Sequence, residues 1–124
     1  MSVDVAEVYR NLTRGQAYAQ VGVEVARAGV GSLVTAEAAL AQITADLDSL
    51  KVDGPKAPTG LKAVATDALA ALRAEYEAHV ASAEDRLAQP ESLQRIIGID
   101  AAAEQRRLNV AQAWLAAIDT VGGA

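Results

Sequence analysis

The sequence contains no cysteine and no phenylalanine, and it has a single histidine and a single tryptophan. The lack of thiols excludes disulfides, thiolate nucleophiles, iron–sulfur clusters and cysteine-based zinc sites. No apolar run approaches the ~18 residues that a membrane-spanning helix needs. The first residues lack the basic and apolar regions of a signal peptide. We therefore expect a soluble protein in the cytoplasm or within an assembled particle such as a virion.

Basic charge is also scarce, because the formal net charge is −5 and the pI is about 4.7. Nucleic-acid-binding domains normally carry a basic face, so this balance argues against a nucleic-acid partner. Arg106 and Arg107 form the only adjacent basic pair, and Asp100 and Glu104 lie close to them in sequence. Such a pair usually marks a solvated helix face.

Alanine is what the chain has in abundance, with 29 of 124 residues, and 52% of all residues are hydrophobic. That length fits a single domain, 1–124. A core of alanine, leucine, valine and isoleucine lets neighbouring backbones lie close together. Period-two runs of β-branched residues are missing, so no sheet is expected.

Four helical segments are predicted from periodic apolar positions, with a boundary inside the last. They are about Val5–Ala28, Ser32–Leu50, Leu61–Ala88 and Glu91–Val121. Four N-caps are expected from residue type, namely Asp4, Ser32, Thr59 and Asp100. Gly98 and Asp100 are expected to divide the last segment into a short turn and a long helix. The predicted fold is all-α, an antiparallel bundle of about four helices made of two hairpins, about 4–50 and 61–121.

The stretch KVDGPKAPTG, residues 51–60, is predicted to be a non-helical spacer between these hairpins. Pro55 and Pro58 prevent a continuous helix and favour extended geometry before each proline. A phosphate-binding loop would need Gly-x-x-x-x-Gly-Lys-Ser/Thr after a strand, and this stretch lacks that spacing. It is therefore interpreted as a connection with some reach.

Small residues recur at intervals of four, three, four and three in the first segment. We call this set the small-residue seam: Gly15, Ala19, Gly22, Ala26 and Gly29. A glycine inside a helix costs up to about 1 kcal/mol relative to alanine. Close approach of a second helix is a natural compensation. The sequence leaves open whether that helix belongs to the same chain or to another subunit.

Residues with catalytic or metal-binding chemistry do not form a recognisable site. His79 shares a helix face with Glu75, and a surface pair between them is the expected arrangement. A di-iron site needs two Glu-x-x-His pairs, and a metalloprotease needs two histidines. Adjacent carboxylates do not face each other on a helix, and no serine lies in a Gly-x-Ser-x-Gly elbow. We expect no enzyme activity, no cofactor, no metal and no small-molecule substrate.

Trp114 is interpreted either as a core residue or as an interface anchor, since tryptophan is enriched in binding hot spots.

The segment Ser32–Leu50, which contains the pattern Thr-Ala-Glu-x-Ala-Leu-x-x-Ile, resembles the N-terminal coiled-coil segment of bacterial flagellins. The second long coiled-coil strand of that family is not evident, and the chain is far shorter than a flagellin. No family membership follows.

These observations favour a non-enzymatic structural or adaptor subunit that acts by helix packing in a homo-oligomer or larger assembly. A tailed-phage neck, tail or capsid accessory protein is an assembly component of this kind. Two alternatives stay open. One is a cytoplasmic binding module or chaperone that takes a partner helix in an apolar groove. The other is an enzyme or cofactor carrier, which would need an internal polar cavity, for instance around His79 and Tyr76.

Overall fold

The computed structural model describes residues 3–54 and 56–122, with the side chain of residue 53 left aside. Over these residues the chain is all-α and folds into five helices, four long and one short. The helices are α1 (Val5–Arg27), α2 (Leu33–Asp53), α3 (Leu61–Leu87), α4 (Glu91–Ile96) and α5 (Ala101–Val121). The predicted all-α class is confirmed, and the helix count is five.

Three of the four predicted N-caps are confirmed by side-chain hydrogen bonds. Asp4 accepts from the backbone N–H of Glu7, and Ser32 accepts from that of Thr35, each at 3.3 Å. Asp100 accepts from two successive N–H groups at the start of α5, at 3.0 and 3.2 Å. Each bond satisfies a donor that the first turn of a helix leaves without an intrahelical partner.

The prediction for Thr59 was wrong, because the N-cap of α3 is Gly60, which has no side chain to accept a bond. The prediction that residues 51–60 are all non-helical was also wrong in part. Helix α2 continues through Lys51 to Asp53 and ends at Gly54, whose N–H donates to the carbonyl of Leu50. Proline restricts the residue immediately before it, so the helix can run almost to Pro55, which lies outside the described residues.

Gly29 and Gly98 end α1 and α4 in the same way. Gly29 has φ +97°, and the next N–H, that of Val30, donates to the carbonyl of Val25 at 3.2 Å. Gly98 has φ +74°, and the N–H of Ile99 donates to the carbonyl of Gln94 at 2.8 Å. This is the Schellman arrangement, which requires a left-handed residue that glycine adopts at little cost.

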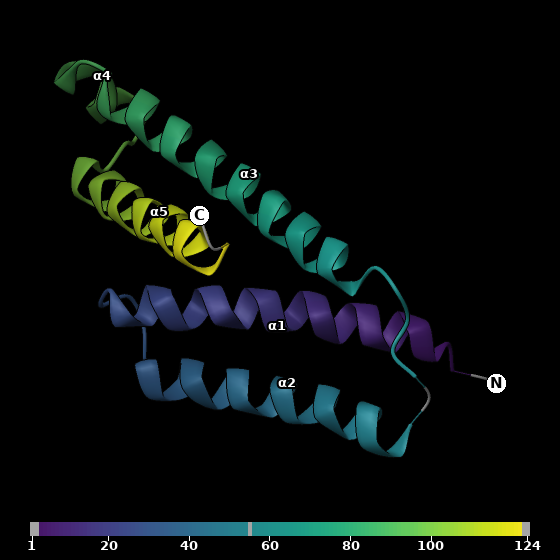
Figure 1. Cartoon of the computed structure of the whole chain (residues 1–124). Coiled ribbons are helices and arrows are strands. Elements are labelled where there is room, and N and C mark those ends of the chain that lie inside the picture. Colours follow the sequence, from purple (N-terminus) through teal and green to yellow (C-terminus); the bar gives the residue numbers. More distant parts are fainter. Residues whose placement is uncertain (1–2, 55, 123–124) are drawn as a thin grey trace.

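Helix α1 is the central element of the structure. It packs against α2 on one side and against both α3 and α5 on the other, while α2 packs chiefly against α1. Figure 1 shows α3 and α5 side by side in opposite directions, with α4 at the end of this pair that projects away from α1. The α3/α5 pair therefore continues beyond the region that α1 covers.

The core lies where α1 meets α3 and α5. Val21 and Val25 of α1 and Ala117 and Ile118 of α5 are buried and form one cluster. Half-buried residues from α3, α5 and the turn after α1 pack around it, including Leu69, Leu72, Trp114, Leu115 and Val30. Arg73 of α3 and Asp119 of α5 form an ion pair across the same two helices.

Candidate functional site

The small-residue seam contacts α2 of the same chain at Gly15. A Cβ atom added at Gly15 would lie 2.5 Å from Cδ1 of Ile43, so a side chain there requires Ile43 to move. The neighbouring Gln16 donates from Nε2 to Oγ1 of Thr44 at 3.2 Å. Gly15 therefore permits the close approach of α1 and α2 that the sequence pattern indicated.

The other seam residues differ from Gly15 and from one another. A Cβ atom at Gly22 would meet no atom within 4 Å, so nothing in the described chain requires a glycine there. Ala19 is half-buried and Ala26 is buried in α1. Gly29 lies outside α1, in its C-terminal turn, so the expectation that all five residues line one helix was wrong. Its spacing fits the pattern, but its backbone ends the helix.

Trp114 belongs to a small aromatic cluster between α3 and α5. Its ring stacks on that of Tyr76, with centroids 4.7 Å apart and planes 5° from parallel. His79 lies one turn further along α3, with its ring centroid 5.6 Å from that of Tyr76. Burial, and secondarily the carboxylate of Glu75, raises the pKa of the Tyr76 phenol above 10.0.

The expected surface pair between Glu75 and His79 is not formed. Among the described residues, His79 has no ion pair with Glu75, and its ring packs near Tyr76 instead. Packing the His79 ring near Tyr76 removes apolar surface from water and so stabilises the fold. An exposed ion pair contributes little to stability. His79 is therefore part of the aromatic cluster.

The end of the α3/α5 pair is held by polar contacts. Glu104 of α5 pairs with Nε of Arg86 on α3 at 2.8 Å and with Arg107 at 3.0 Å. Gln94 of α4 donates to backbone carbonyls of the last α3 turn and the residues that follow it, those of Arg86, Leu87 and Gln89, at 3.0–3.3 Å. Carbonyls at the end of a helix lack intrahelical partners, so Gln94 helps to fix the α3–α4 turn.

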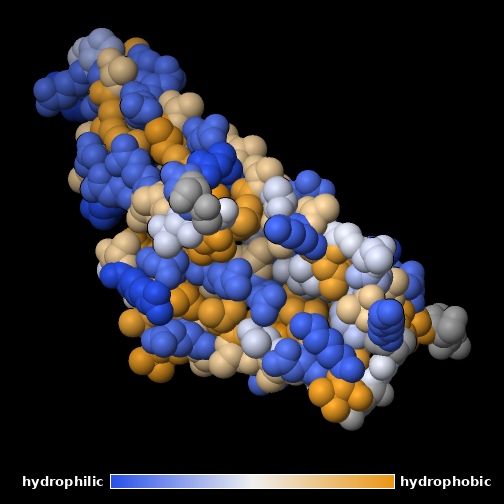
Figure 2. Space-filling model, in the orientation of Figure 1, coloured by the Kyte–Doolittle hydropathy of each residue, from blue (hydrophilic) through white to orange (hydrophobic). Residues whose placement is uncertain are grey.

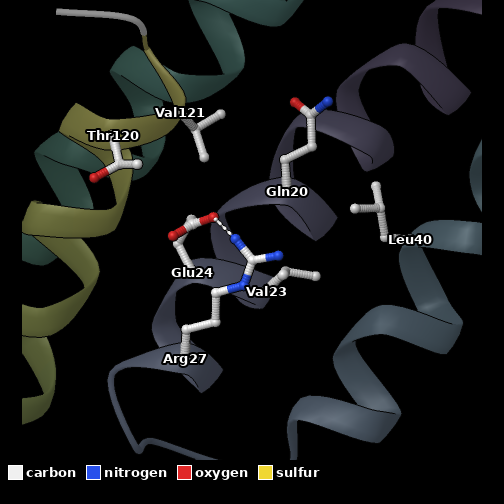
Figure 3. A pocket seen from close by; sticks show the side chains of 7 residues that line it. All are labelled: Gln20, Val23, Glu24, Arg27, Leu40, Thr120 and Val121. Atoms are coloured by element: carbon white, nitrogen blue, oxygen red, sulfur yellow. Dashed lines mark hydrogen bonds and ion pairs between the residues drawn. The ribbon is translucent and has the colours of Figure 1, made fainter.

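A cavity of about 290 Å³ lies over α1 between α2 and α5 (Figure 3). Gln20, Glu24 and Arg27 of α1 line it, with Leu40 from α2 and Thr120 and Val121 from α5. Arg27 donates to Glu24 at 2.7 Å within this group. The opposite charges of this pair offset each other, so the cavity favours neither an anion nor a cation.

A second cavity, of about 300 Å³, lies between α3 and α5, and we call it the α3/α5 cavity. It is lined by Tyr76, His79, Arg106, Arg107, Val110 and Ala111. Its wall is apolar, so the two arginines contribute their aliphatic stems. Arg107 is bound to Glu104, whereas Arg106 forms no ion pair with any described residue. A polar cavity around His79 and Tyr76 was one alternative from the sequence, but the wall of the cavity at these residues is apolar.

Within the described part of the chain, no three His, Asp or Glu side chains are close enough to hold a metal ion. None of the helices in residues 3–54 and 56–122 is both long and apolar enough to cross a bilayer.

Helix α2 carries a second apolar stripe opposite the side that packs on α1. The inward side consists of Ala36, Leu40, Ile43, Leu47 and Leu50, which are half-buried or buried, whereas Leu33 at the start of the helix is exposed. The outer stripe of α2 consists of Val34, Ala38, Ala41, Ala45 and Val52, all exposed. Val34 and Val52 are 80% and 81% exposed, and Figure 2 shows hydrophobic atoms over both ends of α2. The spacing of four, three, four and seven was readable in the sequence but was overlooked.

Comparison with protein-family models, with curated proteins and with solved structures found no match to this chain. Function is therefore inferred from the chain's own surfaces and cavities.

Proposed function

We propose that this protein is a non-enzymatic structural subunit that acts by helix packing in an oligomer of its own copies or in a larger assembly. The observation that carries the proposal is the outer stripe of α2. A helix that is apolar on two opposite sides is normally covered on both. Here α2 packs chiefly against α1, so the outer stripe is left for another chain.

The composition of the outer stripe suits a helical partner. Its three central residues, Ala38, Ala41 and Ala45, are small, so a second helix can approach at the short end of the usual 8–10 Å interaxial distance. Glu37 lies beside the stripe, and Asp48 lies on the same side between Ala45 and Val52. The part of the stripe that has no charged residue within it therefore runs from Val34 to Ala45, and its small residues suit association through backbone proximity.

The expected strength of this contact follows from its size. The stripe from Val34 to Val52 is ~27 Å long at ~1.5 Å per residue and roughly 10 Å wide. The resulting ~300 Å² per partner is well below the ~800 Å² of a standard stable interface. Association through α2 alone is therefore weak and concentration-dependent, and further contacts are needed in a permanent assembly.

A virion component, such as a tailed-phage neck, tail or capsid accessory protein, is the type of assembly that we favour for a small, acidic, alanine-rich subunit. A closed antiparallel bundle of about four helices is the finer architecture that we propose for the assembled subunit. In it, a neighbouring helix completes the open side of α2.

The proposal is tested by placing a charge in the outer stripe. Ala41→Arg puts a guanidinium four residues after Glu37, where the i, i+4 pair supports α2. The variant is therefore expected to fold. It is also expected to reduce the average mass in light scattering at high protein concentration, because a long charged side chain prevents close helix approach.

Ala81→Arg is the matched control. Ala81 is exposed on α3, and Glu77 four residues earlier offers the same i, i+4 partner for the new charge as Glu37 does on α2. The control should keep the mass of the original chain. Equal masses for the original chain and both variants would refute association through α2, and a monomeric chain throughout would favour a module that binds a partner of another kind.

A further inference from the structure

We propose that the α3/α5 cavity binds a small apolar molecule that carries one carboxylate group. This binding site is separate from the outer stripe of α2 and does not depend on the assembly proposal. It rests on three features of the cavity: its apolar wall, the arginine at its edge and its position in the part of the α3/α5 pair that projects away from α1.

The apolar wall fits an aromatic or aliphatic group. Tyr76 and His79 of α3 face Val110 and Ala111 of α5, and the volume of about 300 Å³ is at the lower end of the range for ligand pockets. Tyr76 is held in place by its stack on Trp114, so the wall is formed before a ligand arrives. A preformed wall lowers the ordering cost of binding.

The guanidinium of Arg106 supplies the charge for an anion. It forms no ion pair with a described residue, whereas the adjacent Arg107 and the nearby Arg86 are both engaged by Glu104. Arg106 lines the apolar cavity and is also exposed to solvent, so its guanidinium is available to an anion at the mouth. Guanidinium groups bind carboxylates through two parallel hydrogen bonds, and a carboxylate at the mouth leaves the apolar part of the ligand inside.

The position of the cavity explains why it is open. Tyr76 and Trp114 mark the point where residues of the core cluster give way to the uncovered end of the α3/α5 pair. Val110, one turn before Trp114, is 37% exposed although it is apolar. The carboxylate of Glu75 lies beside Tyr76 on α3 and opposes anion binding, so the charge of Arg106 is essential to the selectivity.

The test uses 4-phenylbutyrate as the probe and the neutral 4-phenyl-1-butanol as its matched analogue. Trp114 is the only tryptophan and stacks on a residue of the cavity wall, so its fluorescence and its indole N–H resonance report binding. We expect a saturable change with 4-phenylbutyrate and a dissociation constant between about 10 μM and 1 mM. The alcohol should bind about 3- to 10-fold more weakly.

Two variants separate the roles of charge and wall. Arg106→Gln should weaken 4-phenylbutyrate binding about 3- to 10-fold and leave the alcohol unaffected, whereas Arg95→Gln, on α4, should change neither. Val110 is partly exposed, so Val110→Phe can place a larger side chain in the cavity without disturbing the core. This variant should abolish binding of both compounds.

No saturable change with either probe would overturn the proposal, as would equal binding to the original chain and to Val110→Phe. Equal affinity for the acid and the alcohol would overturn the assignment of the anion. If 4-phenylbutyrate lowers the mass in light scattering, a second copy of the chain occupies the cavity, and the small-molecule proposal is wrong. The assembly proposal is tested separately, through α2.

Discussion

The two helical glycines of α1 should respond in opposite ways to the same substitution. Gly22→Ala adds a methyl group where no described atom lies within 4 Å. Alanine is more favourable than glycine in a helix by roughly 0.5–1 kcal/mol. Gly22→Ala should therefore raise the free energy of unfolding by about that amount.

Gly15→Ala has the same helical gain but meets Ile43. Its Cβ would lie 2.5 Å from the Cδ1 of Ile43, and carbon atoms in contact prefer about 3.5–4.0 Å. The Ile43 side chain must move by roughly 1 Å, and an off-rotamer side chain costs about 0.5–1.5 kcal/mol. That cost offsets the gain, so the net effect of Gly15→Ala should be close to zero or slightly unfavourable.

Thermal unfolding by circular dichroism measures both effects. An unfolding entropy of about 2.1 cal/mol/K per residue converts the Gly22→Ala gain into a rise of about 2–4 °C in Tm. Gly15→Ala should leave Tm unchanged or lower it slightly. In an Ile43→Val background, which lacks the Cδ1 atom, Gly15→Ala should recover the helical gain.

The reasoning is refuted if Gly22→Ala is less stable than the original chain, because that result requires a neighbour at Gly22 that α1 to α5 do not supply. It is also refuted if Gly15→Ala has the same effect in the original chain and in the Ile43→Val background, since the clash would then not be the cause.

Three further predictions concern the ends of α3 and α5 and the aromatic cluster. Asp100→Ala should lower the free energy of unfolding by about 1 kcal/mol because it removes the acceptor for two N–H groups of α5. Asp100→Asn keeps an acceptor oxygen and should retain most of the stability that the cap contributes. Equal chemical denaturation curves for these two variants would contradict a capping role. Gln94→Ala should cost about 0.5–1.5 kcal/mol and speed amide hydrogen exchange in residues 88–99, and unchanged exchange there would show that the Gln94 bonds contribute nothing. Because the pKa of Tyr76 is raised above 10.0, the stability from its protonated phenol is full below pH 10 and is lost as pH rises through the folded-state pKa. Absorbance at 295 nm, as the difference between the original chain and Tyr76→Phe, should show this ionisation above pH 10, and a midpoint at or below 10 would contradict the burial argument.

The helices themselves were predictable because their signals are local. Periodic apolar positions predicted the four long helical segments, and Asp4, Ser32 and Asp100 are N-caps through bonds to N–H groups two or three residues on. Such bonds depend on residue type and short spacing alone.

Features that depend on relative helix placement were not predictable from spacing. The small-residue repeat predicted the same role for Gly15, Gly22 and Gly29. In the structure Gly15 lies close to Ile43, Gly22 has no neighbour within 4 Å of an added Cβ atom, and Gly29 ends the helix. Two alternative causes, close packing and a left-handed backbone, both favour glycine. The apolar wall of the α3/α5 cavity was not predictable for the same reason, because Tyr76 and Val110 are far apart in sequence.

The most direct test of the assembly proposal is the absolute mass of the unmodified chain by light scattering across a hundredfold range of concentration. The outer stripe of α2 predicts a mass near 12.8 kDa at the lowest concentration that rises towards a multiple of this value. A mass that stays at 12.8 kDa across the whole range would contradict the proposal that this protein acts by packing against its own copies.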